Sequence, residues 1–198
     1  MNAPATSSAT GNGLTGERAE LITMLERHRA FLLQTTEGLT EEQARTASTV
    51  SALTIGSLLK HVADTEEQWM DFAVRGAEAF GGVYDDVDWA AVDEAAGGEA
   101  VVDEAGGGEW EDTRFVLSDA ETLEVLRARV EQVAARTEEI LRSADLDSAH
   151  DLPVAPWFEP GARWSVRRVA MHMLAEISQH AGHADIVREA IDGQKTMG

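Results

Sequence analysis

The sequence predicts an all-α fold, a four-helix bundle whose helices are joined by long connections. Four segments have the length of helices and repeat their apolar residues at helical spacing. Segments rich in glycine and proline separate them, and no segment alternates apolar and polar residues as a half-buried strand does. At 198 residues the chain fits one domain with a sizeable core. We therefore expect four long helices around a shared apolar interior.

The first two long helices are predicted at about residues 16–37 and 54–75. Gly38 supplies a stop signal for the first helix. Thr40-Glu-Glu-Gln43 then has the spacing of a capping box, which predicts a short helical turn. The second long helix is indicated by residues that share much of one helical face, namely Leu58, His61, Val62, Trp69 and Phe72.

Residues 81–112 interrupt the helical pattern with an acidic loop between the second and third helices. The segment contains glycine pairs and triples and many acidic residues, and it has no basic residue. This composition favours a solvated, partly disordered insertion. The alternative is a lid or a partner-binding segment anchored by Tyr84, Trp89 and Trp110.

The third and fourth helices are each predicted from an N-terminal signal. Ser118-Asp-Ala-Glu121 has capping-box spacing and indicates a third helix that starts there and runs to about residue 143. The three prolines of residues 151–164 then predict a loop, whose apolar stretch 154–158 can pack over the end of the bundle. Ser165 is a favourable N-cap for the fourth helix, which we expect to run to about residue 191 and stop near Gly193.

Composition excludes several kinds of partner and chemistry. The net charge is −20, so we expect no nucleic acid and no membrane partner. The chain has no cysteine, so any metal must be held by nitrogen and oxygen ligands, and any reacting thiol must come from a small molecule. No segment reaches the ~18–20 apolar residues of a membrane span.

The domain organisation follows from the same patterns. Residues 1–16 lack the apolar region of a signal peptide and predict a disordered leader. The bundle domain is expected at residues 17–191, followed by a tail at 192–198. We expect a cytoplasmic protein that is a monomer or a homodimer.

Three polar side chains of the fourth helix, Glu176, His180 and His183, fall within a narrow stripe, because a helix turns about 100° per residue. An acid and two imidazoles beside apolar neighbours are costly to bury without a partner, and a divalent metal ion suits that set. Gly182, inside the helix, indicates that a ligand or another helix approaches closely.

Helical spacing limits which side chains of the fourth helix can bind the same metal ion. Residues at i and i+4 lie about 6 Å apart along the axis and can converge on one ion. Glu176 and His180 have this spacing, and so do His172 and Glu176. His172 and His180 are about 12 Å apart along the axis, too far to share one ion. Of the two pairs that remain we take Glu176 and His180, partly because Gly182 and His183 follow them.

His61 is the best candidate for a third ligand, from the inward face of the second helix. A single histidine on an apolar face is more often a hydrogen-bonded core residue, but its pairing with the fourth-helix stripe favours a metal ligand. Asp64, Thr65 and Gln68 lie one to two turns further along and can fix the tautomer of its ring.

Two motifs, one on the second helix and one on the fourth, carry a resemblance to a known superfamily. The first is Leu58-Leu-Lys-His61-Val-Ala-Asp-Thr-Glu66-Glu-Gln-Trp69, and the second is Glu176-Ile-Ser-Gln-His180-Ala-Gly-His183. Together they resemble the DinB-like four-helix superfamily over about residues 18–189. Glu176 stands where many members have histidine, as in the subgroup of mycothiol-dependent S-transferases and the metal-binding domain of mycothiol-dependent maleylpyruvate isomerase. This resemblance implies that His61, Glu176 and His180 hold zinc.

Two histidines and a carboxylate with an open position fit catalytic zinc and fit equally the iron site of non-haem oxygenases. The resemblance favours zinc, and iron and nickel are the alternatives. Zinc can hold a small-molecule thiol as its thiolate at neutral pH. His183 can then move the proton or orient the substrate, or it is a hydrogen-bonded packing residue.

The function that these features predict is a metal-dependent transferase that conjugates a low-molecular-weight thiol, such as mycothiol, to an electrophilic small molecule. One alternative is a non-enzymatic metal-binding bundle with a stress-response or partner-binding role. Another is a thiol-dependent isomerase, although the isomerases that the chain resembles carry a second domain, for which there is no room before Gly198.

Overall fold

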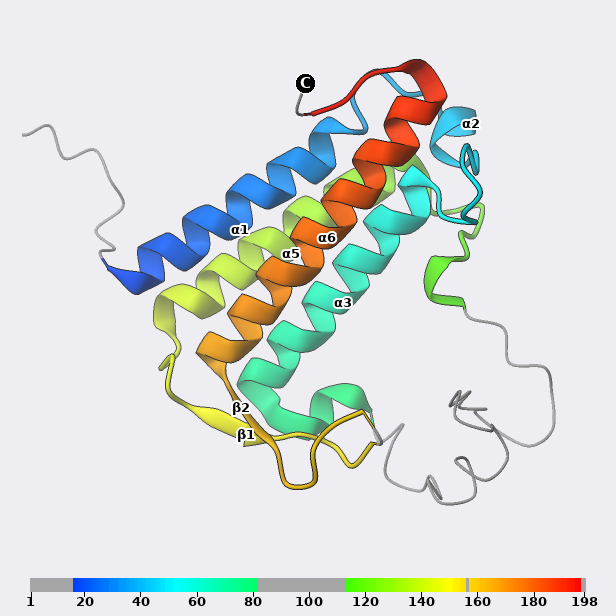
Figure 1. The fold of residues 1–198 in the computed structure, drawn as a ribbon. Helices are drawn as coiled ribbons and strands as arrows, with labels where there is room; N and C mark the ends of the chain where they lie inside the picture. Colours follow the sequence, from blue (N-terminus) through cyan, green and yellow to red (C-terminus); the bar gives the residue numbers. More distant parts are fainter. Residues whose placement is uncertain (1–15, 82–112, 156, 197–198) are drawn as a thin grey trace, which may run out of the picture.

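In the computed structural model, four long helices lie side by side and form a bundle (Figure 1). The structure describes residues 16–81, 113–155 and 157–196, so almost all of the predicted leader and acidic insertion lie outside the described residues. The elements are α1 (Glu17–Gln34), α2 (Glu41–Ala44), α3 (Ile55–Arg75), η1 (Gly76–Phe80), η2 (Thr113–Phe115), α5 (Leu123–Ser143), β1 (Ala149–Asp151), β2 (Arg163–Ser165) and α6 (Val166–Asp192). The predicted all-α bundle is confirmed.

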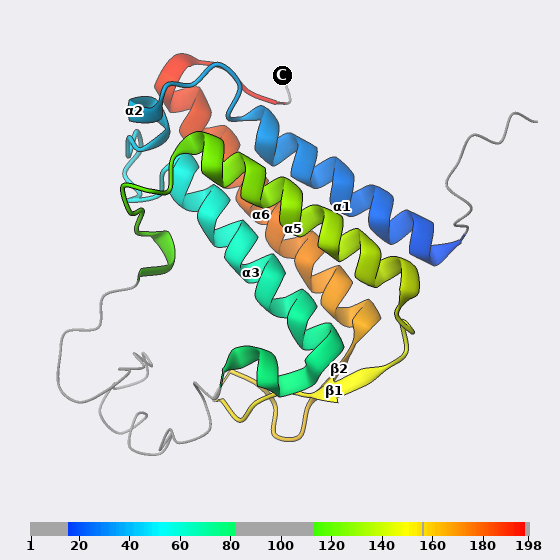
Figure 2. The same ribbon diagram turned by 180° about the vertical axis from the view of Figure 1, so that it is seen from behind.

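Helix α6 lies between α1 and α3, and α5 packs mainly against α3 (Figures 1 and 2). All four helices contribute side chains to one apolar core, whose removal from water is the main stabilising contribution. The largest of these buried side chains are Leu25, Leu32, Ile55, Leu58, Leu59, Met70, Phe72, Leu126, Leu141, Met173 and Ile177. None of the helices in the described ranges is long and apolar enough to cross a bilayer.

Local capping interactions determine where α3 and α6 begin. The Thr54 hydroxyl accepts a hydrogen bond from the Ser57 N–H, and the Ser57 hydroxyl accepts one from the Thr54 N–H. The Ser165 hydroxyl likewise accepts from the Arg168 N–H at the start of α6. Helix α6 ends at Asp192 and is capped by Gly193, whose φ of 80° is left-handed. Both helices lie within two residues of their predicted bounds because these caps join residues close in sequence.

The predicted start of the third helix at Ser118 is wrong, because α5 begins at Leu123 with Thr122 as its N-cap. The Glu121 carboxylate does accept hydrogen bonds from the Ser118 N–H and hydroxyl. However, Arg45 Nη2 donates to the carbonyl oxygens of Ser118 and Glu121, each at 3.0 Å. Those carbonyls would accept the first hydrogen bonds of a helix that began at Ser118, so the helix starts one turn later.

The structure adds two short strands that the sequence did not predict. Strands β1 and β2 pair antiparallel, with His150 opposite Trp164. Each strand has three residues, too few to show the alternation that identifies a strand in a sequence.

An aromatic cluster closes the end of the bundle beside these strands. Trp164 stacks on Trp69 with ring centroids 4.7 Å apart, and Phe158 packs edge-on against both rings. Val154 and Trp157, from the same predicted apolar stretch, are exposed. The prediction that this stretch packs over the bundle end is therefore correct for Phe158 and wrong for Val154, while the half-exposed Trp157 meets the Phe158 ring edge-on.

A buried polar cluster joins three of the four helices. Arg29 of α1 donates to Glu66 of α3, with Nη2 2.6 Å from Oε1 and Nε 3.3 Å from Oε2. Thr137 of α5 donates its hydroxyl to the same Glu66 oxygen at 2.6 Å. Glu66 is 1% exposed, so among the described residues its charge is compensated by these two partners and not by water.

A second buried arginine, Arg188, joins α6 to the end of α1. Its Nη1 donates to the carbonyl oxygens of Thr35 and Glu37 at 2.7 Å each, and its other nitrogens bond to Asp192. These bonds satisfy carbonyls that the end of α1 leaves without helical partners.

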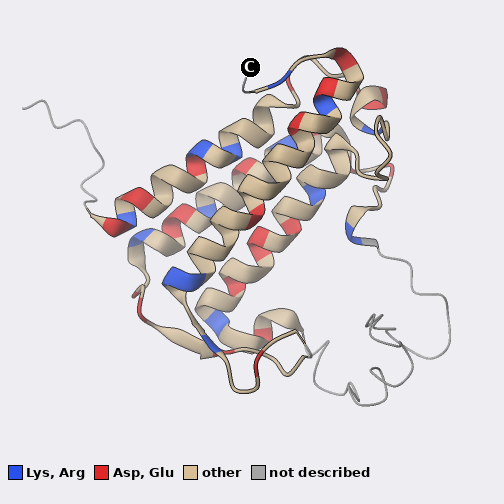
Figure 3. Ribbon diagram, in the orientation of Figure 1, with Lys and Arg blue, Asp and Glu red and all other residues tan. Residues whose placement is uncertain are grey.

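Charges of both signs line the outer faces of the helices (Figure 3). Between α3 and α5, Arg129 pairs with Asp64 and Glu67, and Arg136 pairs with Asp71. Pairs this exposed contribute little to stability individually.

Arg29→Leu is expected to lower the free energy of unfolding by about 3–5 kcal/mol, because it leaves the Glu66 charge buried without its cation. Urea denaturation followed by circular dichroism measures the loss. Glu67→Gln, which breaks an exposed pair on the same helix, should cost less than about 1 kcal/mol. An equal effect of the two substitutions would contradict a dominant role for the buried pair.

Gly182→Ala is expected to stabilise the protein by about 0.5–1 kcal/mol, because alanine favours a helix interior. A Cβ added at Gly182 meets no described atom within 4 Å, so the prediction that another helix approaches this glycine is wrong. At the buried Gly56, by contrast, the added Cβ would lie 2.7 Å from Leu117 Cδ1, and Gly56→Ala should destabilise. Thermal unfolding compares the two variants. A loss of stability in Gly182→Ala would refute the placement of Gly182 in a helix interior with open space beside it.

Candidate metal centre

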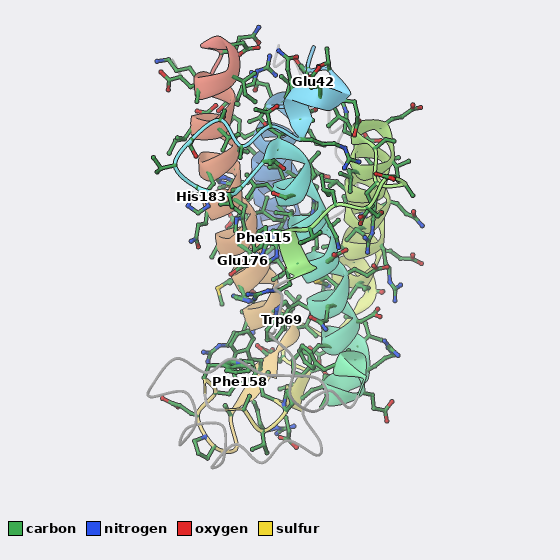
Figure 4. The ribbon with its side chains drawn as sticks, turned by 90° about the vertical axis from the view of Figure 1, so that its right-hand side faces the viewer. Glu42, Trp69, Phe115, Phe158, Glu176 and His183 are labelled. Carbon is green, nitrogen blue, oxygen red and sulfur yellow. The ribbon has the colours of Figure 1, made fainter. Side chains whose placement is uncertain are left out.

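The structure brings the three predicted ligand residues together across the interface of α3 and α6. His61 comes from α3, and Glu176 and His180 come from successive turns of α6. One ligand atom from each lies within 4.8 Å of the other two, the only such group of three among the described residues. Figure 4 shows Glu176 on the side of the bundle where Phe115, Trp69 and His183 also lie.

The two nitrogens of His180 have different neighbours. Its Nε2 lies 3.5 Å from Glu176 Oε2, and its Nδ1 lies 3.5 Å from Nδ1 of His183. The His61 ring meets the His180 ring edge-on, with centroids 4.7 Å apart. His183 therefore contacts a member of the group from outside and does not belong to it.

Burial favours the form of these imidazoles that binds metals. Desolvation lowers the pKa of His61 and of His180 below the ordinary value, although the nearby Glu176 carboxylate opposes the shift in both. Both rings are therefore neutral at pH 7 and keep a lone pair for a cation.

The donor set fits a divalent metal ion. Two ligands held tetrahedrally at ~2.0–2.1 Å from one ion lie roughly 3.4 Å apart, which agrees with the 3.5 Å between His180 Nε2 and Glu176 Oε2. Two imidazoles and one carboxylate occupy three positions and leave a fourth for a substrate.

The predicted role of Asp64, Thr65 and Gln68 in fixing the tautomer of His61 is not supported. The hydrogen bonds of the described residues include none from the His61 ring to these three side chains. Asp64 instead forms ion pairs with Lys60 and with Arg129 of α5. Lys60 of the same helix and Arg129 of α5 thus bind the Asp64 carboxylate, which the sequence pattern had assigned to His61.

A cavity of about 350 Å³ opens beside His61. Its lining is mainly polar and includes Asp64, Thr65, Gln68 and Arg129. A second cavity of about 320 Å³ lies between α1 and α5, but it is mainly apolar and contains no imidazole. Of these two cavities, the one beside His61 is therefore the one that reaches a candidate ligand, His61 itself.

The sequence did not predict the contacts that two side chains near the site make. Phe115 stacks on His61, although it follows the acidic insertion and lies far away in the sequence. His172, one turn before Glu176, packs edge-on against Trp69 and Trp164 and lies outside the ligand group. No periodicity or motif in the sequence marks Phe115, because its partner is on another helix.

Comparisons with known proteins bear on both the fold and the site. The family model described as mycothiol S-transferase matches residues 20–193. A solved structure, a conserved protein from Enterococcus faecalis, has a TM-score of 0.60 and 14% identity, and the match covers 91% of this chain and 100% of that chain. At this identity the likeness shows a shared fold only. No curated protein matches the chain.

The metal-free protein is expected to lose stability as the pH falls below about 6.5. Burial lowers the pKa of His61, His172 and His180 from 6.5, so the unfolded chain binds more protons below that pH than the folded one does. Urea denaturation in the presence of a chelator, between about pH 5 and pH 8, measures the slope. His61→Gln should make the slope shallower, and stability that rises on acidification would refute the prediction.

Proposed function

Because the chain belongs to the mycothiol S-transferase family, a metal-dependent family of the DinB-like superfamily, we propose that it joins a low-molecular-weight thiol to an electrophilic small molecule. The observation that carries the proposal is the convergence of His61, Glu176 and His180. The chain has no cysteine, so the reacting sulfur must arrive with a co-substrate. The family indicates mycothiol as that thiol.

In this proposal His61 Nδ1 or Nε2, a Glu176 oxygen and His180 Nε2 hold the metal ion. Zinc suits a set of two histidines and one carboxylate with an open position, and iron and nickel are the alternatives. A bound zinc ion would supply the Lewis acidity that keeps a small-molecule thiol deprotonated at neutral pH.

His183 is proposed to orient His180. If His180 uses Nε2 for the metal, its Nδ1 keeps a proton and donates to Nδ1 of His183. This contact fixes the tautomer of His180, as the outer partners of metal-bound histidines commonly do. His183 then carries its own proton on Nε2 and can take part in moving the proton that the thiol gives up.

The cavity beside His61 is proposed to receive the body of the thiol. Its volume of about 350 Å³ lies within the range of small-molecule sites. Its wall carries carboxylates and guanidinium groups side by side, and Arg129 is paired there with Asp64 and Glu67, so the wall offers hydrogen-bond donors and acceptors of both signs. Such a wall favours a neutral polar thiol over a strongly charged one.

The proposal is tested by mixing zinc-loaded protein with the thiol and an electrophile whose absorbance changes on conjugation. The rate should depend on protein, disappear with a chelator and return with zinc. His61→Ala should lose bound metal, as measured by elemental analysis, and reduce kcat/KM by at least about 100-fold. His28→Ala, a half-buried histidine of α1 outside the site, is the matched control. Unchanged metal content in His61→Ala would refute the site.

Chelation also distinguishes the enzyme from a bundle that binds metal only for stability. The apolar core and the Arg29–Glu66 pair hold the helices together without an ion, so the metal-free protein should keep its helical circular dichroism at room temperature. Unfolding on chelation would instead support a structural metal, whose binding energy is folding energy.

A further inference from the structure

Phe115 of η2 lies against the ring of His61. The two rings are stacked, with centroids 4.4 Å apart and planes inclined by 27°. The Phe115 centroid is also 6.5 Å from that of His180. Figure 4 shows Phe115 next to Glu176 on the side of the bundle that carries the candidate ligands.

The segment 115–121, which we call the strap, is fastened to α3 by an apolar contact. Leu117 packs against the core, and its Cδ1 lies 2.7 Å from where a Cβ of Gly56 would be. Any side chain at position 56 would push Leu117 away from the helix. Glycine at this buried position therefore permits the close approach of the strap.

Polar contacts fasten the other end of the strap. Arg45 Nη2 donates to the carbonyl oxygens of Ser118 and Glu121 at 3.0 Å each. Glu121 Oε1 also lies 3.6 Å from Nζ of Lys60, the residue that precedes His61 on α3. These contacts hold the strap on the C-terminal side of Phe115, and the contact between Glu121 and Lys60 lies beside the helical turn that carries His61.

The ring of His61 has no hydrogen bond among the described residues that would set its orientation. His180, in contrast, has partners at both of its nitrogens. Histidines that bind metals need such an orienting contact, because a freely rotating ring presents its lone pair to the metal only part of the time. His61 meets two rings, that of His180 edge-on and that of Phe115 stacked, and Phe115 is the one of the two that is not itself a candidate ligand.

We propose that Phe115 is the positioning residue for His61. The strap holds the Phe115 ring against the imidazole of His61, and this contact keeps the imidazole pointing toward Glu176 and His180. The inference rests on the proposed function, because the orientation matters for a metal centre. It assigns a role to the segment that follows the acidic insertion, and it explains why Gly56 lacks a side chain.

The test compares Phe115→Ala with Phe115→Tyr, which keeps the aromatic ring, and with Val116→Ala, an exposed neighbour on the strap. Zinc affinity is measured by competition with a chelator, and the visible spectrum of the cobalt-loaded protein reports ligand geometry. Phe115→Ala should weaken zinc binding by about 10-fold or more and alter the cobalt spectrum. Phe115→Tyr should bind zinc within about twofold of the wild-type affinity and should keep the wild-type cobalt spectrum. Val116→Ala should match the wild type in both measurements.

A second measurement needs no metal. In the metal-free protein the stacked Phe115 ring shields the ring protons of His61, so their NMR resonances should move downfield in Phe115→Ala and stay in place in Val116→Ala. Unchanged resonances would overturn the proposal even if the variant lost stability.

The outcomes separate the strap from the metal centre. Wild-type zinc affinity and an unaltered cobalt spectrum in Phe115→Ala would overturn the role of Phe115 and leave the centre intact. If the wild-type protein binds neither zinc nor cobalt, the proposed metal centre fails and this inference fails with it.

Discussion

The ion pair between Arg29 and Glu66 is the constraint on which the rest of the structure depends. An unpaired charge in the core would cost several kcal/mol, so only a packing that keeps these side chains together is stable. Glu66 also accepts the Thr137 hydroxyl, which brings α5 into the same arrangement. Since a helix turns about 100° per residue, Glu66 and His61 point roughly 140° apart on α3. Directing Glu66 into the core therefore leaves His61 on the side that meets α6.

Helix α6 is positioned along its length by a different arginine. Arg188 bonds to the carbonyl oxygens of Thr35 and Glu37 and so fixes the end of α6 against the end of α1. Glu176 and His180 lie two to three turns earlier on the same rigid helix. The candidate centre is thus built from side chains whose backbones are held by buried polar contacts outside it, as a preorganised site requires.

The ligand residues differ in what orients them. Contacts within α6 orient His180, because Glu176 and His183 lie four residues before it and three after it. The orienting contact of His61 comes from Phe115, on a separate segment of the chain. The half of the site on α6 is therefore encoded locally, whereas the half on α3 depends on a long-range contact. Loss of the strap should affect the α3 half first.

The sequence by itself determined what depends on near neighbours in the chain. Apolar period and caps located α3 and α6 to within two residues, and helical spacing showed that His172 and His180 cannot share one ion. Tertiary structure alone decided the delayed start of α5, the short strands, and the placement of Phe115 on His61. Each of these depends on a partner far away in the sequence. Local sequence patterns do not identify which distant residues come into contact when the helices pack.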